Sequence, residues 1–174
     1  MPPTGSDAYR AARCEAAFKK QGGDTQRIRL FNSFTSSICQ FLKEQGSLRL
    51  GEIPVLGFFQ DQETWLLATS QRVIWSRPGY KHQLKYIEIK GLGWSSGPDG
   101  ETKRESAATI DQWIETDDGM KMTKHSSPWL FLLDLNGNRH EVLLEPGTPL
   151  IAIWDSISLM IRLEKIHPRE FHLG

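Results

Sequence analysis

The chain has 174 residues, of which 39% are hydrophobic, and its 21 Lys and Arg side chains balance its 21 Asp and Glu side chains. This length suffices for a single domain that buries a substantial core. The neutral balance excludes a global field that would draw the protein onto nucleic acid or an anionic membrane.

Charge is nevertheless distributed unevenly along the chain. Residues 1–50 carry eight basic and four acidic side chains, whereas residues 99–118 carry seven acidic and two basic ones. Such a separation can orient a partner, although charge runs more commonly form solvated faces. No apolar run approaches the roughly 20 residues of a membrane-spanning helix, and we expect no secretory leader.

The two cysteines, Cys14 and Cys39, do not form a CxxC pair. This usage favours a reducing, cytoplasmic setting. Cys39 is expected to be a small core residue. Cys14 has Arg10 and Arg13 nearby in sequence, so a slightly activated thiol is an alternative to a structural role.

Residues 1–6 are expected to be a disordered lead-in, and residues 7–50 to form two helices. The first helix runs from Asp7 to about Gln21, where Gly22-Gly23 stops it. The second is expected from a cap at Asp24 to about Gln45. Its apolar side chains recur at spacings of three and four and are Ile28, Phe31, Phe34, Thr35, Ile38, Phe41 and Leu42. This aromatic stripe must be covered, either by the strands that follow or by a partner helix or second copy.

The stretch from Thr64 to Trp75 alternates apolar and polar residues on either side of Ser70-Gln71, which predicts a hairpin of two short strands. A strand beginning near Val55 precedes it, because Pro54 fits only the start of a strand or a bulge. Pro78-Gly79 predicts a turn and a basic loop. The next strand is expected from Leu84 to Ile89, with a bulge near Tyr86, and to continue through Leu92 and Trp94.

Beyond a polar loop at 95–105, alternation around Ile110–Ile114 predicts a further strand, and 120–124 a short return strand. Asn136-Gly137 predicts a hairpin between the apolar run after Pro128 and a strand at 139–144. Thr148-Pro149 begins a long amphipathic helix that reaches about Ile166, leaving residues 168–174 as a tail.

The motif LLATSQRVIW resembles the hairpin "hydrophobic run–Thr–x–x–Arg–hydrophobic" of bacterial pleckstrin-homology-like (PH-like) and GRAM-like domains. Thr69, Arg72 and Trp75 occupy the matching positions, and Glu52 and the stretch KYIEI are also similar. The order of short antiparallel strands followed by one long helix is similar too. The resemblance covers about residues 52–166.

For the domain at 51–167, this resemblance implies an α+β fold. It would be an antiparallel, partly open barrel of seven strands, or eight with residues 120–124, capped by the C-terminal helix and preceded by the two N-terminal helices. Packing also favours a helix in this position, because two curled sheets leave an open corner that an amphipathic helix can fill. Trp154 and Ile157 would form that plug.

No catalytic constellation is apparent in the sequence. Motifs of the GxSxG, HExxH and GxxxxGK types are lacking, and the five histidines are scattered without metal-ligand spacing. We therefore expect a binding module that is not an enzyme and holds no metal or cofactor. Nucleic-acid binding is not expected, since the tryptophans alternate with aliphatic residues rather than with Arg or Lys.

Three kinds of binding remain open. The first is a protein–protein interaction, as in an adaptor or an inhibitor or immunity-type protein, with candidate interface residues Phe31, Phe34, Trp113, Asp117 and Asp118. The second is the anionic-lipid or phosphoinositide binding that the resemblance implies, through the basic 77–85 loop, with Arg77, Tyr80, Lys81, His82 and Lys85. The loop that holds phosphates in such relatives is acidic here, at residues 60–63. The third is homo-oligomerisation, as a homodimer for example, through the helix expected at 25–45.

Overall fold

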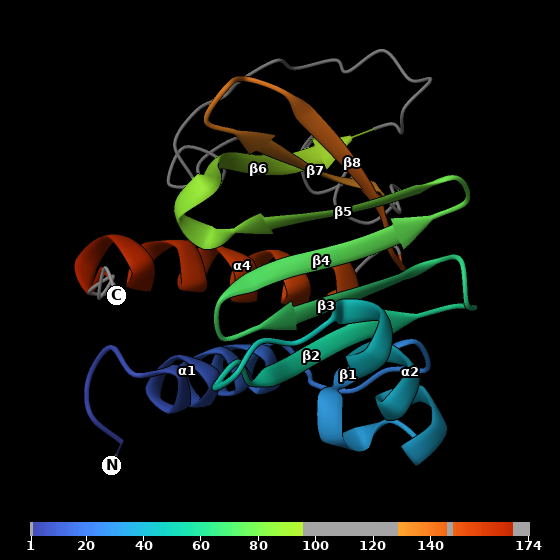
Figure 1. Cartoon of the computed structure of the whole chain (residues 1–174), viewed down its shortest axis with the longest axis horizontal. Coiled ribbons are helices and arrows are strands. Elements are labelled where there is room, and N and C mark those ends of the chain that lie inside the picture. The colour runs from blue at the N-terminus through green and yellow to red at the C-terminus, as the bar shows by residue number, and fades with distance from the viewer. Residues whose placement is uncertain (1, 96–128, 146–147, 169–174) are drawn as a thin grey trace.

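The computed structural model describes residues 2–95, 129–145 and 148–168 (Figure 1). These residues form an α+β fold of three α-helices and two antiparallel sheets. The helices are α1 (Asp7–Lys20), α2 (Ser36–Gly46) and α4 (Thr148–Ile166).

One sheet has five strands in the order β1-β2-β3-β4-β5 and the other has three in the order β6-β7-β8. Within the described ranges, no strand pairing joins the two sheets into a closed barrel. The strands of the first sheet are β1 (Ile28–Leu30), β2 (Pro54–Phe59), β3 (Trp65–Thr69), β4 (Arg72–Arg77) and β5 (Tyr80–Lys85). Those of the second are β6 (Ile89–Ser95), β7 (Trp129–Asp134) and β8 (Arg139–Leu143).

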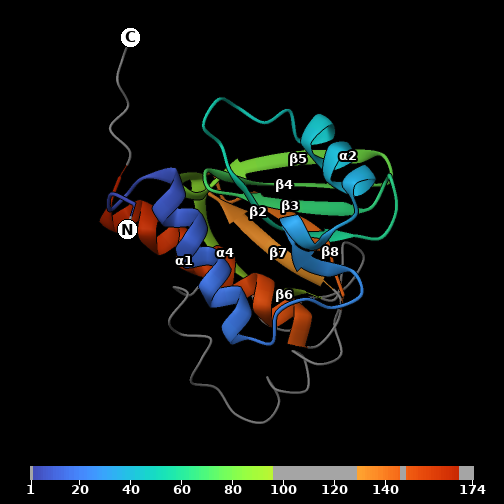
Figure 2. The ribbon, with the colours of Figure 1, turned by 90° about the horizontal axis from the view of Figure 1, so that it is seen from below.

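The main core lies between the two sheets and α4. Period-2 alternation turns Leu66 and Ala68 of β3, and Val73 and Trp75 of β4, toward one face of the five-stranded sheet. There they join apolar side chains of the smaller sheet and of α4, including Ile157. The expected covering of the strands by the C-terminal helix is thus confirmed. The first helix, α1, lies beside α4 (Figure 2) and adds Cys14 and Phe18 to the same core.

The opposite face of the five-stranded sheet is covered by α2. Trp65, Leu67 and Ile74 point to this outer face and pack with Leu42 of α2 and Phe31. Gly57 of β2 lies beneath them, where an added Cβ would meet the Leu66 carbonyl oxygen at 2.9 Å and the Phe34 ring at 3.3 Å. A residue without a side chain is required at this point for the outer layer to approach the sheet.

The second N-terminal helix is shorter than the sequence suggests, and its expected start at Asp24 is wrong. Residues 28–30 instead form β1, which pairs with β2, and a 3-10 turn, η1 (Phe31–Ser33), leads into α2. The Asp24 carboxylate accepts a hydrogen bond from the Leu30 N–H at 2.7 Å, so it ties a turn rather than capping a helix. The apolar residues at these spacings serve two layers, since Ile28 of β1 packs in the main core and Phe31 of η1 packs in the outer layer with α2.

The strand expected from Leu84 to Ile89 is also corrected. The chain forms β5 up to Lys85, makes a 3-10 turn, η2 (Tyr86–Glu88), and then enters the other sheet as β6. The change of phase at Tyr86 therefore marks the crossing between sheets and not a bulge. The basic 77–85 loop is likewise mostly strand, since only Pro78 and Gly79 turn the β4–β5 hairpin.

Burial raises the pKa of the Cys14 thiol to about 12, so the alternative of an activated thiol is wrong.

Among the described residues, no helix is long and apolar enough to traverse a lipid bilayer. The strands expected around 110–114 and 120–124 lie outside the described residues.

Candidate functional site: a basic cleft between α2 and β5

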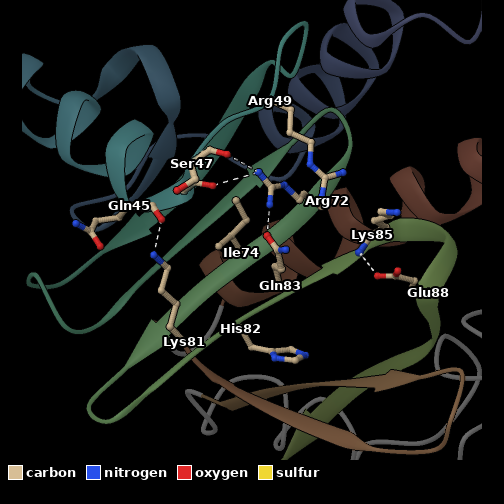
Figure 3. Close-up of a pocket in the computed structure, with 11 residues that line it drawn as sticks. Gln45, Ser47, Arg49, Arg72, Ile74, Lys81, His82, Gln83, Lys85 and Glu88 are labelled. Carbon is tan, nitrogen blue, oxygen red and sulfur yellow. Dashed lines mark hydrogen bonds between the residues drawn. The ribbon is translucent and has the colours of Figure 1, made fainter. Parts of the chain in front are cut away.

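A cleft of about 800 Å³ opens on the outer face of the five-stranded sheet, between the C-terminal end of α2 and strand β5 (Figure 3). Lys81, Gln83 and Lys85 face it because alternate residues of a strand share one side. Arg72 contributes from β4, and Arg49 from the chain that follows α2. These four cations thus come from three separate segments of the described chain.

Arg72 lies at the base of the cleft and is held by a buried carboxylate. Its Nε donates to Glu52 Oε1 at 2.8 Å and a terminal nitrogen donates to Glu52 Oε2 at 2.9 Å. The same terminal nitrogen donates to the carbonyls of Gly46 and Ser47 at the end of α2, and the other donates to Gln83. Arg72 therefore fixes the end of α2 to the sheet.

Thr69, the last residue of β3, completes this network. Its hydroxyl donates to Glu52 Oε1 at 2.6 Å and accepts from the main-chain N–H of Arg72 at 3.1 Å. Burial raises the pKa of Glu52, but hydrogen bonds from Arg72, Thr69 and the Arg49 N–H outweigh it and leave this pKa below its usual value. The Thr–x–x–Arg motif thus has a structural role, with Glu52 as its third member.

Because Glu52 neutralises Arg72, the remaining charges that the described residues bring to the cleft are Arg49, Lys81 and Lys85 against Glu88. Lys81 is exposed and is oriented by its contacts, since its ammonium donates to the Gln45 carbonyl and lies 5.6 Å from the Trp65 ring centroid. Glu88 accepts from the Lys85 N–H at 2.8 Å. The cleft therefore has a net positive charge suited to an anionic ligand.

A second polar cluster joins the two sheets on the other side of β5. The Tyr80 hydroxyl lies 2.9 Å from His140 Nδ1, and His140 Nε2 lies 3.1 Å from an Asp134 oxygen. The His82 ring stacks on the His140 ring with 4.4 Å between centroids. Burial, and then the neighbouring His140, lower the pKa of His82.

This cluster has the connectivity of a proton relay, but its electrostatics favour a structural role. Hydrogen bonds from Asn138 and then His140 hold the pKa of Asp134 well below its usual value. Burial raises the pKa of Tyr80, which disfavours a phenolate nucleophile at neutral pH. Within the described part of the chain, no three His, Cys, Asp or Glu side chains gather as metal ligands.

The structure brings together only some of the residues that the sequence points to. Lys81 and Lys85 line the cleft, and His82 borders it while its ring turns away toward β8 (Figure 3). Tyr80 belongs to the second cluster. The Arg77 guanidinium lies 4.7 Å from the centroid of the Tyr80 ring.

The candidate partner residues are more dispersed. Phe31, which is 3% exposed, packs between α2 and the sheet, and the half-buried Phe34 lies against the same cluster. Trp113, Asp117 and Asp118 lie outside the described residues. The sequence did not point to Arg49 or His140 as site residues, because each is brought into place by contacts distant in sequence.

Comparisons with protein-family models, curated proteins and solved structures gave no match for this chain.

Proposed function

We propose that the protein is a non-catalytic binding module that recognises an acidic segment of a protein partner in the basic cleft. The observation that carries this proposal is the convergence of Arg49, Lys81 and Lys85 around one cavity of about 800 Å³. Lys81 is already oriented by the α2 carbonyl, so little side-chain ordering would oppose binding. A cytoplasmic setting belongs to the proposal and is supported by two cysteines that form no disulfide.

The PH-like architecture also belongs to this proposal. What supports it is the chain order from Pro54 onward: four antiparallel strands of one sheet, three of another, and a C-terminal helix in the shared core. Strand β1 and helices α1 and α2 would be additions to that plan. A homo-oligomer formed through residues 25–45 has less support, because Phe31 is used in internal packing.

Peptide titration tests the proposal. The probe is an eight-residue peptide of alternating Glu and Val, and a Gln–Val peptide is the uncharged control. The affinity of each peptide is measured by calorimetry at low ionic strength. The double variant Lys81→Glu, Lys85→Glu should bind the acidic peptide about tenfold more weakly, since exposed charge pairs each contribute up to about 1 kcal/mol. A matched pair of exposed lysines outside the cleft, Lys20→Glu with Lys90→Glu, should change the affinity much less.

Equal affinity of the wild-type protein for the acidic and uncharged peptides would contradict the proposal. A second candidate, anionic-lipid binding, is favoured by Leu50, whose side chain is fully exposed next to Arg49 at the cleft. Co-sedimentation with phosphatidylserine vesicles separates the two. Vesicle binding that Leu50→Ser and Lys85→Glu each abolish, without acidic-peptide binding, would identify the lipid.

A further inference from the structure

Strand β5 is the outer strand of its sheet on the side of the cleft. Among the strands of residues 2–95 and 129–145 it pairs only with β4, through the two-residue turn at Pro78 and Gly79. In such a hairpin the residues flanking the turn, Arg77 and Tyr80, exchange hydrogen bonds, and every second pair does the same. The main-chain groups of Lys81 and Gln83 therefore point away from β4, along the edge of the sheet.

The opposite edge of the same sheet is closed by its own chain. At β1, the Leu30 N–H donates to Asp24, the Ile28 N–H donates to the Thr25 hydroxyl at 3.0 Å, and the Ile28 carbonyl accepts from the Thr25 N–H at 2.7 Å. In the part of the chain described, no hydrogen bond closes the outward main-chain groups of Lys81 or Gln83 in this way. Among the described residues the two edges thus differ, and the outward main-chain groups of Lys81 and Gln83 on β5 are available to an added strand.

The side chains of β5 select what can pair there. Residues opposite each other on neighbouring strands place their side chains on the same face. A strand added to β5 would therefore bring alternate side chains over the cleft, directly opposite Lys81 and Lys85. Acidic side chains at those positions would be attracted, and the intervening ones would lie on the other face.

A second copy of this chain does not fit the same edge. Two β5 strands placed together would bring the lysines of both copies close to one another, and like charges opposite each other destabilise a strand pair. Lysines on edge strands commonly prevent self-association for this reason. They prevent pairing with a basic or identical strand, but they favour an acidic one.

We propose that an acidic protein segment binds this molecule as an added strand on the edge of β5, with alternate carboxylates over the basic cleft. The inference rests on the proposed function and goes beyond it, because it assigns main-chain hydrogen bonds to Lys81 and Gln83 and an extended conformation to the partner. It also predicts alternation of acidic residues rather than a simple acidic cluster.

Main-chain methylation of the peptide tests this geometry on the intact protein. The alternating Glu–Val peptide is compared with two versions, one N-methylated at every Glu and the other at every Val. In an added strand, either the Glu residues or the Val residues turn their N–H groups toward β5, and the other set turns them away. Methylation of the set facing β5 should weaken binding at least tenfold, whereas methylation of the other should change it less than about threefold.

The outcomes separate this inference from the proposed function. Binding that is equally sensitive, or equally insensitive, to the two methylations would overturn strand addition while leaving acidic-segment binding intact. A parent peptide that binds no better than its Gln–Val control would overturn both. A peptide with four consecutive Glu followed by four Val should bind more weakly than the alternating one, and an equal affinity would also count against strand addition.

Discussion

At the scale of single residues, Glu52 gives the sharpest prediction. Its side chain is fully buried and paired with Arg72, so Glu52→Gln would leave the guanidinium in the protein interior without a counter-charge. Breaking a buried pair in this way costs about 3 kcal/mol of unfolding free energy. Chemical denaturation should show this loss at neutral pH. The matched control is Glu15→Gln, which breaks an exposed pair with Lys19 and should cost no more than about 0.5 kcal/mol.

The same pair predicts a pH dependence. Because the pKa of Glu52 is lower in the folded protein than in the unfolded chain, the unfolded state takes up its proton first as the pH falls. The stabilisation by this carboxylate is therefore present above its ordinary pKa of 4.5 and is lost as the pH falls through the folded value. The stability difference between wild type and Glu52→Gln should shrink over that window. A difference that stays constant down to full acid unfolding would contradict the assignment.

The site was only partly predictable at this scale. Lys81 and Lys85 stand out in the sequence because basic residues gather after Pro78-Gly79, and Thr69 and Arg72 stand out as a motif. Glu52 stands out only as part of the resemblance, and its pairing with Arg72 does not, because the two residues are 20 positions apart in the chain. Arg49 reaches the cleft only through the turn after α2. The Tyr80–His140 contact likewise joins two sheets, and no local sequence pattern predicts it.

At the scale of elements, the approach of the outer layer to the sheet depends on Gly57. In Gly57→Ala the new methyl group would lie 2.9 Å from the Leu66 carbonyl oxygen, which the strand pairing prevents from moving, and 3.3 Å from the Phe34 ring. Overpacking of this kind costs about 2 kcal/mol. Thermal unfolding should therefore begin at a clearly lower temperature than in the wild type.

Gly91 supplies the control for this prediction. It also lies in a strand, β6, but an added Cβ there would meet no atom within 4 Å. Gly91→Ala should change the unfolding free energy by less than about 1 kcal/mol, and the restricted unfolded chain favours a small gain. Equal destabilisation by the two substitutions would mean that the effect comes from strand backbone preferences and not from the outer layer.

Elements with strong local signals were predicted well from the sequence, and those decided by tertiary pairing were not. The hairpin at 64–75, the Asn136-Gly137 turn and the helix from Thr148 agree with the structure because alternation, turn chemistry and helical periodicity are local. At Asp24 the local pattern favoured a helix, but pairing with the edge of β2 made Ile28–Leu30 a strand. The change in alternation at Tyr86 does mark an interruption of the strand, but the interruption is the 3-10 turn between the two sheets and not a bulge.

At the scale of the whole molecule, the N-terminal segment and the strands that follow it share one core. Strand β1 extends the larger sheet, and α1 packs along α4, where Arg10 forms a buried ion pair with Glu164. On the other face of the larger sheet, Phe31 and Leu42 of the predicted aromatic stripe pack with Trp65. A core shared in this way predicts that unfolding is cooperative across the chain.

Ile157→Asp tests this shared core, because Ile157 is 0% exposed where α4 meets the other core elements. An unpaired carboxylate there costs several kcal/mol, a large part of the 5–15 kcal/mol that stabilises a typical domain. The variant should lose its near-ultraviolet circular dichroism together with its thermal transition. Ile166→Asp makes the same change on the same helix at a residue that is 66% exposed, and should cost no more than about 1 kcal/mol. If both variants melted like the wild type, α4 could not be holding the two sheets together.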